Sequence, residues 1–127
     1  MRTSLFYIGA LLSGWMSLPA AAQMVPCSGD DTIYTGRGGS TQEWIQIKPG
    51  QGCEMGIEIG GRQQSIDFVK IMSRPKIGFA GTNGNHKVMY RSNGPAGTDS
   101  FDIGIGVIAP NGTSKLFMRK VNVTIAP

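Results

Sequence analysis

The sequence has little of what an active site or a metal centre is built from. Its 127 residues include one histidine and two cysteines, and 16% of the chain is charged. It has no Gly-x-Ser-x-Gly motif, no His-Glu-x-x-His motif and no phosphate loop followed by a helix. A structural zinc ion takes four ligands, which two thiolates and one imidazole cannot supply. We therefore expect no catalytic residue, no cofactor and no metal, and a protein that is not an enzyme.

Helical periodicity is also missing beyond the first 22 residues. No window of about 11 residues repeats apolar side chains at helical spacing. Instead, 19 glycines fit many turns better than they fit helices, and turn signals recur about every eight to twelve residues. This pattern predicts an all-β fold, a single sandwich of two antiparallel sheets.

Residues 1–22 are expected to be a signal peptide outside the fold. A positive Met1-Arg2 start precedes an apolar run, Pro19 breaks that run, and Ala20-Ala21-Ala22 supplies the small residues that a signal peptidase reads. A membrane anchor is the alternative, but polar residues and a glycine interrupt the run, and a spanning helix needs about 20 apolar residues. We expect cleavage after Ala22, no transmembrane anchor in the mature form, and one domain over residues 23–127, periplasmic or secreted.

The two cysteines, Cys27 and Cys53, both lie in the part that is expected to be exported. An even pair in an oxidising compartment predicts one disulfide. Cys53 falls on the inward face of a predicted strand over residues 53–59, so the bridge would pin the N-terminal segment to a sheet. The closed loop of about 26 residues corresponds to roughly 3.5 kcal/mol in the chain-entropy model.

Alternating apolar and polar residues predict further strands. With the segment above, they cover residues 32–35, 41–48, 65–72, 77–80, 86–91, 101–107 and 115–125. Segment 65–72 has apolar groups on both faces, which predicts a central strand or one that changes face at a bulge. Gly60-Gly61 predicts a hairpin turn directly before it, and Asn83-Gly84 predicts another.

The last predicted strand changes phase along its length. Leu116 and Met118 alternate out of step with the apolar residues of the 121–125 segment. In a regular strand, residues of opposite phase lie on opposite faces of the sheet. We therefore predict a bulge or a crossover near Arg119 and Lys120.

The stretch from Tyr90 to Val107 organises the chain. Phe101 begins a run of four alternating apolar residues on one face, whereas Asp102, Gly104 and Gly106 lie on the other. This phase predicts that Phe101 and Tyr90 are anchors of the core.

Two carboxylates of this stretch are the nearest approach to a catalytic pair. Asp99 and Asp102 stand three residues apart on a strand, so their side chains point to opposite faces. That geometry suits neither a shared proton nor a calcium cage. We expect Asp99 to cap a turn.

The motif residues of this region resemble those of bacterial cadherin-like, immunoglobulin-like domains. The resemblance covers about residues 66–125 and rests on Pro75-Lys76-Ile77-Gly78-Phe79, the Asn83-Gly84 turn, Tyr90, Gly97, Asp99, Ser100 and Phe101. In that family the motif is structural: the proline and glycines shape a hairpin, the tyrosine packs, and the aspartate fixes a corner before a core strand. The resemblance implies an immunoglobulin-like β-sandwich of the small, single-domain secreted kind, to which no activity is assigned.

Charge is distributed unevenly along the chain. Residues 30–58 carry five acids and two bases, whereas residues 62–120 carry nine bases and three acids, a net charge of +6. Such a balance favours contact with lipopolysaccharide or acidic glycans. The alternative is that dispersed charges simply keep a small secreted domain soluble. The candidate contacts with an anionic partner are Lys76, Lys87, Arg91, Arg119 and Lys120.

Two functions follow from these observations. The first is a non-enzymatic, secreted or periplasmic immunoglobulin-like module that acts through protein or glycan contacts. The alternative is a cell-envelope binder that uses a basic face for anionic glycans or lipopolysaccharide. A contiguous basic patch favours the second, and bases scattered over the surface favour the first. The expected compartment argues against nucleic acid as a partner.

Overall fold

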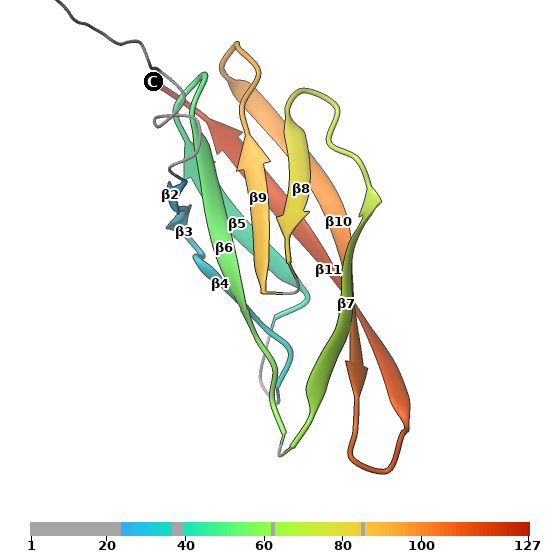
Figure 1. Cartoon of the computed structure of the whole chain (residues 1–127). Coiled ribbons are helices and arrows are strands. Elements are labelled where there is room, and N and C mark those ends of the chain that lie inside the picture. Colours follow the sequence, from blue (N-terminus) through green and yellow to red (C-terminus); the bar gives the residue numbers. More distant parts are fainter. Residues whose placement is uncertain (1–23, 37–39, 62, 85) are drawn as a thin grey trace, which may run out of the picture.

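The structure is a computed structural model, and it describes residues 24–36, 40–61, 63–84 and 86–127. The signal peptide predicted over residues 1–22 lies outside these ranges. Every regular element in them is a strand, and they contain no helix long and apolar enough to cross a membrane. The prediction of an all-β sandwich is confirmed, because the strands form two sheets that face each other (Figure 1). The sheets are mixed rather than antiparallel as predicted: the strand at residues 42–47 runs parallel to residues 120–125, and the short strands at residues 25–26 and 32–34 run parallel to the strand at residues 52–58.

The strands follow one another along the chain without an intervening helix (Figure 1). They are β2 (Val25–Pro26), β3 (Ser28–Gly29), β4 (Thr32–Tyr34), β5 (Gln42–Ile47), β6 (Gly52–Glu58), β7 (Ser65–Ser73), β8 (Phe79–Asn83), β9 (Lys87–Arg91), β10 (Gly97–Ile108) and β11 (Ser114–Ile125). One sheet, here called the β10 sheet, has the order β3-β5-β11-β10-β7. The other, the β6 sheet, has the order β2-β6-β9-β8, and β4 also pairs with β6.

The long hairpin of β10 and β11 forms the centre of the β10 sheet. The two strands pair without interruption from Gly97 and Ile125 to Ile108 and Ser114. The predicted bulge or crossover near residues 119–120 is therefore wrong. Leu116 and Met118 simply lie on the outer, exposed face of a regular strand, while the inward phase continues through residues 117 and 119.

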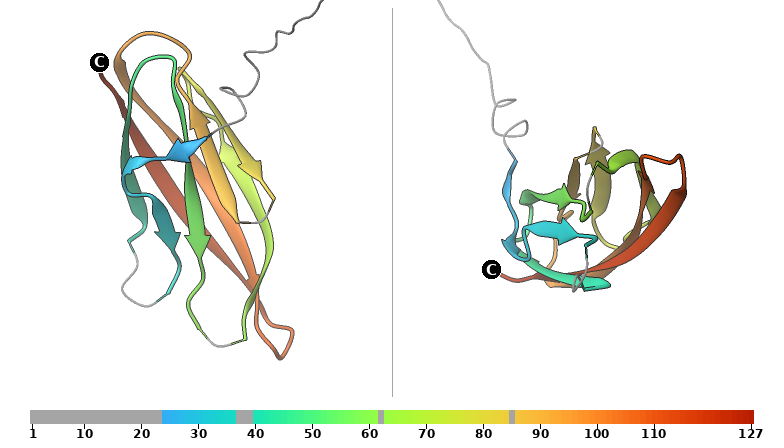
Figure 2. Two further views of the ribbon diagram at one scale, coloured as in Figure 1. Left: turned by 60° about the vertical axis from the view of Figure 1, so that its left-hand side comes forward. Right: turned by 90° about the horizontal axis from the view of Figure 1, so that it is seen from below.

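The connection between β6 and β7 also differs from the prediction. Gly60-Gly61 predicts a hairpin turn, but β6 and β7 belong to different sheets, so the chain changes layer between Glu58 and Ser65 (Figure 2). The predicted hairpin at the Asn83-Gly84 turn is confirmed, because β8 and β9 pair antiparallel on either side of it. Adjacent strands along the chain pair only when the connection keeps them in one layer.

Strand β7 is an edge strand, which corrects the alternative of a central position. Its pairing with β10 shifts register at Asp102/Ile103 and again at Gly106/Val107, so the predicted bulge is confirmed. The shift lets Ile66 and Val69 both face the core, whereas Phe68 lies on the outer face over Gly106. The apolar residues on both faces of this strand are therefore explained by a bulge and by outward-facing apolar side chains such as Phe68 and Met72.

The core lies between the two sheets, as the phase of β10 predicts. Tyr90 and Phe101 are at most 1% exposed, and their stacked ring centroids are 5.8 Å apart. Around them pack the fully buried aliphatic residues of both layers: Ile33, Ile45, Met55, Val88, Ile103, Ile105, Val107, Val121, Val123 and Ile125. The prediction that Tyr90 and Phe101 anchor the core is confirmed by their burial.

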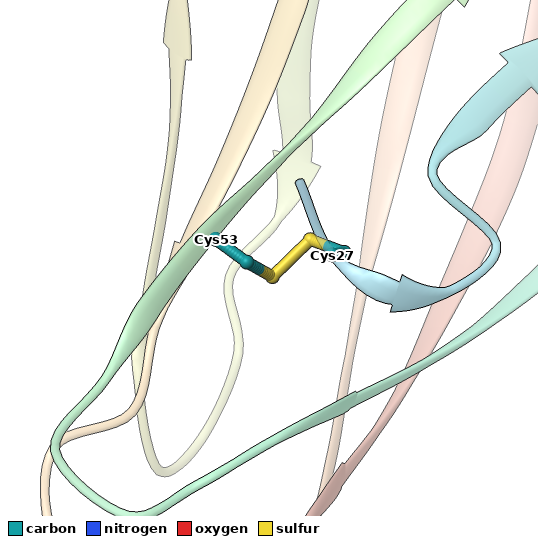
Figure 3. Close-up of a disulfide and its surroundings, with 2 residues drawn as sticks. All are labelled: Cys27 and Cys53. Carbon is teal, nitrogen blue, oxygen red and sulfur yellow. A yellow bond between two sulfur atoms is a disulfide. The ribbon is translucent and has the colours of Figure 1, made fainter. Parts of the chain in front are cut away.

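The predicted disulfide is confirmed. Cys27, between β2 and β3, is bonded to Cys53 of β6, with the two Cα atoms 4.8 Å apart (Figure 3). Both side chains are buried. Because β3 pairs with β5 while β2 pairs with β6, the N-terminal segment contacts both sheets and the bridge fixes it at their junction.

Removing this bridge is expected to cost roughly 3.5 kcal/mol of unfolding free energy, because the unfolded chain regains the freedom of a 26-residue loop. The measurement is urea denaturation of the oxidised protein and of the Cys27→Ala, Cys53→Ala double variant. Reduced wild-type protein is the control and should match the double variant. A difference below about 1 kcal/mol would contradict the expectation.

Candidate functional site

Asp99, near the start of β10, holds the loop between β7 and β8 in place. Its oxygens accept hydrogen bonds from the backbone amides of residues 76–78 at 2.8, 3.1 and 2.8 Å. They accept two more, from the Tyr90 hydroxyl at 2.8 Å and from the Ser100 amide at 2.9 Å. Asp99 therefore fixes three successive residues of the loop, in agreement with the expected role as a turn cap.

These hydrogen bonds decide the ionisation state of Asp99. Burial raises the pKa of its carboxyl, but the bonds from the Gly78 amide, the Tyr90 hydroxyl and further amides outweigh burial and lower this pKa below its usual value. Burial and the bond to Asp99 raise the pKa of Tyr90 above its ordinary value. At neutral pH the pair is a charged acceptor and a neutral donor, an arrangement that suits a structural anchor rather than proton transfer.

Two further residues of β10, Gly97 of the predicted motif and Asp102 of the carboxylate pair, lie on either side of this anchor along the strand. Gly97 begins β10 with a φ of 156°, which side-chain-bearing residues rarely adopt. Asp102 lies on the outer face, where its carboxylate accepts a hydrogen bond from the Ser73 hydroxyl at 3.0 Å. Asp99 and Asp102 thus point to opposite sides of β10, as the strand period predicts.

The fixed loop forms one wall of a shallow depression on the outer face of the β10 sheet. The depression has a volume of about 520 Å³. Its opposite wall is Trp44 of β5, whose side chain is exposed. Its remaining lining residues are Lys76, Ile77, Thr98, Asp99, Ser100, Asn122, Val123 and Thr124. One aromatic ring, one ammonium group and several hydroxyl and amide groups therefore meet at one place.

Neighbouring strands hold the polar side of this depression in position. Asn122 of β11 donates hydrogen bonds from its side-chain nitrogen to the Gln42 side chain at 3.1 Å and to the Glu43 carbonyl at 3.2 Å. The Trp44 amide donates to the Asp30 carboxylate at 2.7 Å. Backbone pairing of β5 with β11 sets Trp44 opposite Asn122. The depression is thus built on paired strands rather than on loops alone.

The other half of the same face is rich in apolar side chains, although the Lys70 ammonium lies there too, 4.9 Å from the Phe68 ring centroid. Phe68 and Met72 of β7 and Leu116 and Met118 of β11 form what we call the apolar strip. Between these strands β10 has glycines: a Cβ at Gly106 would collide with the Phe68 ring. The glycines thus make room for larger side chains of the neighbouring strands to lie over bare backbone.

One of the five predicted basic contacts is not on the surface. Arg119 is only 7% exposed, because the regular register of β11 turns it toward the inside. Its guanidinium donates to the Met118 carbonyl at 2.9 Å and to the Tyr34 carbonyl at 3.5 Å, and it lies 5.6 Å from the Phe117 ring centroid. Arg119 is therefore excluded as a contact for an anionic partner.

The remaining four predicted bases do not share a face. Lys120 projects from the outer face of the β10 sheet, opposite Asp102 in the register. Lys87 and Arg91 share a phase on β9, opposite to its buried residues, and so face outward from the β6 sheet. Lys87 also forms an ion pair with Glu54 at 3.4 Å. Lys76 alone lines the depression, so these bases are scattered rather than gathered in one patch.

Trp44 lies in the segment predicted as a strand over residues 41–48, and the sequence patterns gave it no functional role. A single exposed aromatic residue is common on protein surfaces, so Trp44 becomes informative only through the polar residues that the fold places beside it. The phase of Leu116 and Met118 predicts a bulge, whereas in the structure both are exposed on the outer face of a regular strand. The residues that the structure describes contain no cluster of three or more histidine, cysteine or acidic side chains placed to hold a metal.

Comparison with known proteins adds no relative to these observations. No family model matches the chain, and no curated protein matches it in sequence.

Proposed function

We propose that this chain is a non-enzymatic, secreted or periplasmic module of immunoglobulin-like kind that acts by contact with a protein or glycan partner. The observation that carries the proposal is the outer face of the β10 sheet. There Trp44, Met72, Leu116 and Met118 are each 45–56% exposed. Exposing apolar side chains of this size to water is unfavourable, and their grouping on one face is typical of an interaction surface.

Three further observations support the proposal. The buried disulfide suits an oxidising compartment. Asp99 and Tyr90, a hydrogen-bonded pair in which both pKa values are shifted, hold a loop in place, which leaves the pair no role as a general acid or base. The two-layer fold, with a tyrosine in the core and an aspartate fixing a corner, fits an immunoglobulin-like, cadherin-like relationship.

The distribution of charge favours contact through this face over binding through a basic face. The candidate bases are divided between the two sheets, one is buried, and Lys87 is partly neutralised by Glu54. Charges spread in this way give little local attraction once salt screens them, since the screening length is about 10 Å at 0.1 M. The exposed apolar side chains on the outer face of the β10 sheet therefore support the proposed function better than the net positive charge does.

The test is affinity capture from a cell-envelope extract, followed by mass spectrometry, with wild-type protein and Met118→Glu as baits. Glutamate in the apolar strip puts a charge where we expect apolar contact, so partner recovery should fall at least about tenfold, which corresponds to 1.4 kcal/mol. Phe79→Glu is the matched control, because Phe79 is also an exposed apolar residue, 67% exposed, on β8 of the other sheet. Equal recovery with Met118→Glu and wild type would contradict the use of this strip.

A further inference from the structure

We infer that the depression between Trp44 and the loop at residues 76–78 is a binding site for an acidic sugar residue of a glycan. The inference rests on the proposed function as a contact module and names the chemistry of one of its partners. A pyranose ring has an apolar C–H face and a rim of hydroxyl groups. An acidic sugar adds a carboxylate. The depression offers a complement to each of these three parts.

Trp44 complements the apolar face of the ring. It is more than half exposed on a strand whose other outward neighbours, Gln42 and Gln46, are polar. An exposed indole presents a large rigid surface with a negative face, against which the polarised C–H groups of a sugar can pack. Its backbone is held by Asp30 and by the pairing with β11, so the ring is presented from a fixed position.

The hydroxyl and amide groups complement the rim of the sugar. Thr98 and Ser100 of β10 and Asn122 and Thr124 of β11 line the depression from two paired strands. Hydroxyl and amide groups both donate and accept hydrogen bonds, which suits a ligand whose hydroxyls do the same. Asn122 is already oriented by Gln42, so one element of the rim is preorganised.

Lys76 complements the carboxylate. It is exposed and lines the wall opposite Trp44. The Asp99 carboxylate is close to it, but that group accepts five hydrogen bonds and is thereby held in the structural anchor. An ammonium group forms stronger hydrogen bonds with a carboxylate than with a neutral hydroxyl, so Lys76 favours an acidic over a neutral sugar.

The same composition argues against a protein as the occupant of this depression. The cores of protein interfaces are enriched in aromatic residues and methionine, and they are depleted in serine and lysine. The apolar strip fits that description, whereas the depression pairs one aromatic residue with Lys76, Ser100 and two threonines. The two halves of the face are therefore suited to different ligands, and each can be altered without the other.

The experiment titrates the protein, purified after export, with two tetrasaccharides: oligogalacturonate, which is acidic, and cellotetraose, which is neutral. Calorimetry measures the affinity of wild type, Trp44→Ala and Lys76→Gln. Trp44→Ala should weaken binding of oligogalacturonate at least about tenfold. Lys76→Gln should weaken the affinity for oligogalacturonate about fivefold or more and leave the affinity for cellotetraose unchanged. Added salt should weaken the binding of oligogalacturonate to wild type in the same way, because it screens the Lys76 charge.

Two matched variants keep the result interpretable. Phe79→Ala removes another exposed aromatic ring, and Lys87→Gln removes another exposed ammonium, both from the β6 sheet. Neither should change the affinity for either sugar. Thermal melts check that every variant folds, which is expected because all four side chains are exposed.

The outcomes separate this inference from the proposed function. If wild type binds neither saccharide at 10 mM, or if Phe79→Ala weakens binding as much as Trp44→Ala, the sugar site is wrong. If Trp44→Ala instead removes a captured envelope protein, the depression is a protein contact and the inference is overturned while the contact module stands. If Met118→Glu captures the same partners as wild type while the sugar still binds, the inference holds and the proposed use of the apolar strip is wrong.

Discussion

Replacing Asp99 with alanine is expected to lower the free energy of unfolding by about 3–5 kcal/mol. The substitution leaves four backbone amides and the Tyr90 hydroxyl without their acceptor. Four of these donors, at Ile77, Gly78, Tyr90 and Ser100, are partly or fully buried, and each unsatisfied buried group costs on the order of 1–3 kcal/mol. Chemical denaturation measures the loss.

Asp102→Ala is the matched control, because it removes a carboxylate from the same strand that accepts one hydrogen bond on the outer face. Its loss should stay below about 1 kcal/mol. The pH profile gives a second readout. The pKa of Asp99 is lower in the folded state than the ordinary value of 3.8, so its contribution is complete well above pH 3.8 and declines as the pH falls through and below that value. Asp99→Asn should lack this part of the acid destabilisation. If its stability varied with pH as that of wild type does, the role of the Asp99 carboxylate as an anchor would be contradicted.

Replacing Phe101 with alanine is expected to cost about 3–5 kcal/mol, because it opens a cavity at the centre of the sandwich. Phe101 is buried and its ring stacks on that of Tyr90, so little can move in to fill the space. Urea denaturation is again the measurement. Phe79→Ala, which truncates the same side chain at an exposed site, should cost less than about 1 kcal/mol. Similar losses for the two variants would mean that the cavity is not what limits stability.

Local patterns predicted the strands because alternation depends on information that lies within a few residues, and the disulfide was predictable because Cys27 and Cys53 are the only two cysteines of the chain. The period of two places Phe101 inward and Trp44 outward without reference to any partner strand. The pairing of strands depends on distant segments, and here prediction failed. Gly60-Gly61 has the composition of a hairpin turn, but the chain crosses between sheets there because β6 pairs with β9 and β7 pairs with β10.

The candidate site was predicted only in fragments. Lys76 was identified by its charge and Asp99 by its motif, but their positions around one depression depend on the loop that Asp99 fixes. Arg119 was misplaced because its strand was expected to change phase, and a regular register turns it inward. Trp44 reaches this site through the parallel pairing of β5 with β11, and that pairing joins segments about 78 residues apart, which no local pattern reports.

The middle strand of the β10 sheet has a consequence for the order of assembly. β11 lies between β5 and β10, yet it follows every other strand along the chain. While a ribosome or a translocation pore still holds residues 114–125, β5 has no partner on that side, and Val121, Val123 and Ile125 are missing from the core. The two halves of this sheet are therefore joined only when β11 emerges, and its parallel pairing with β5 is a contact of long sequence separation, which forms slowly.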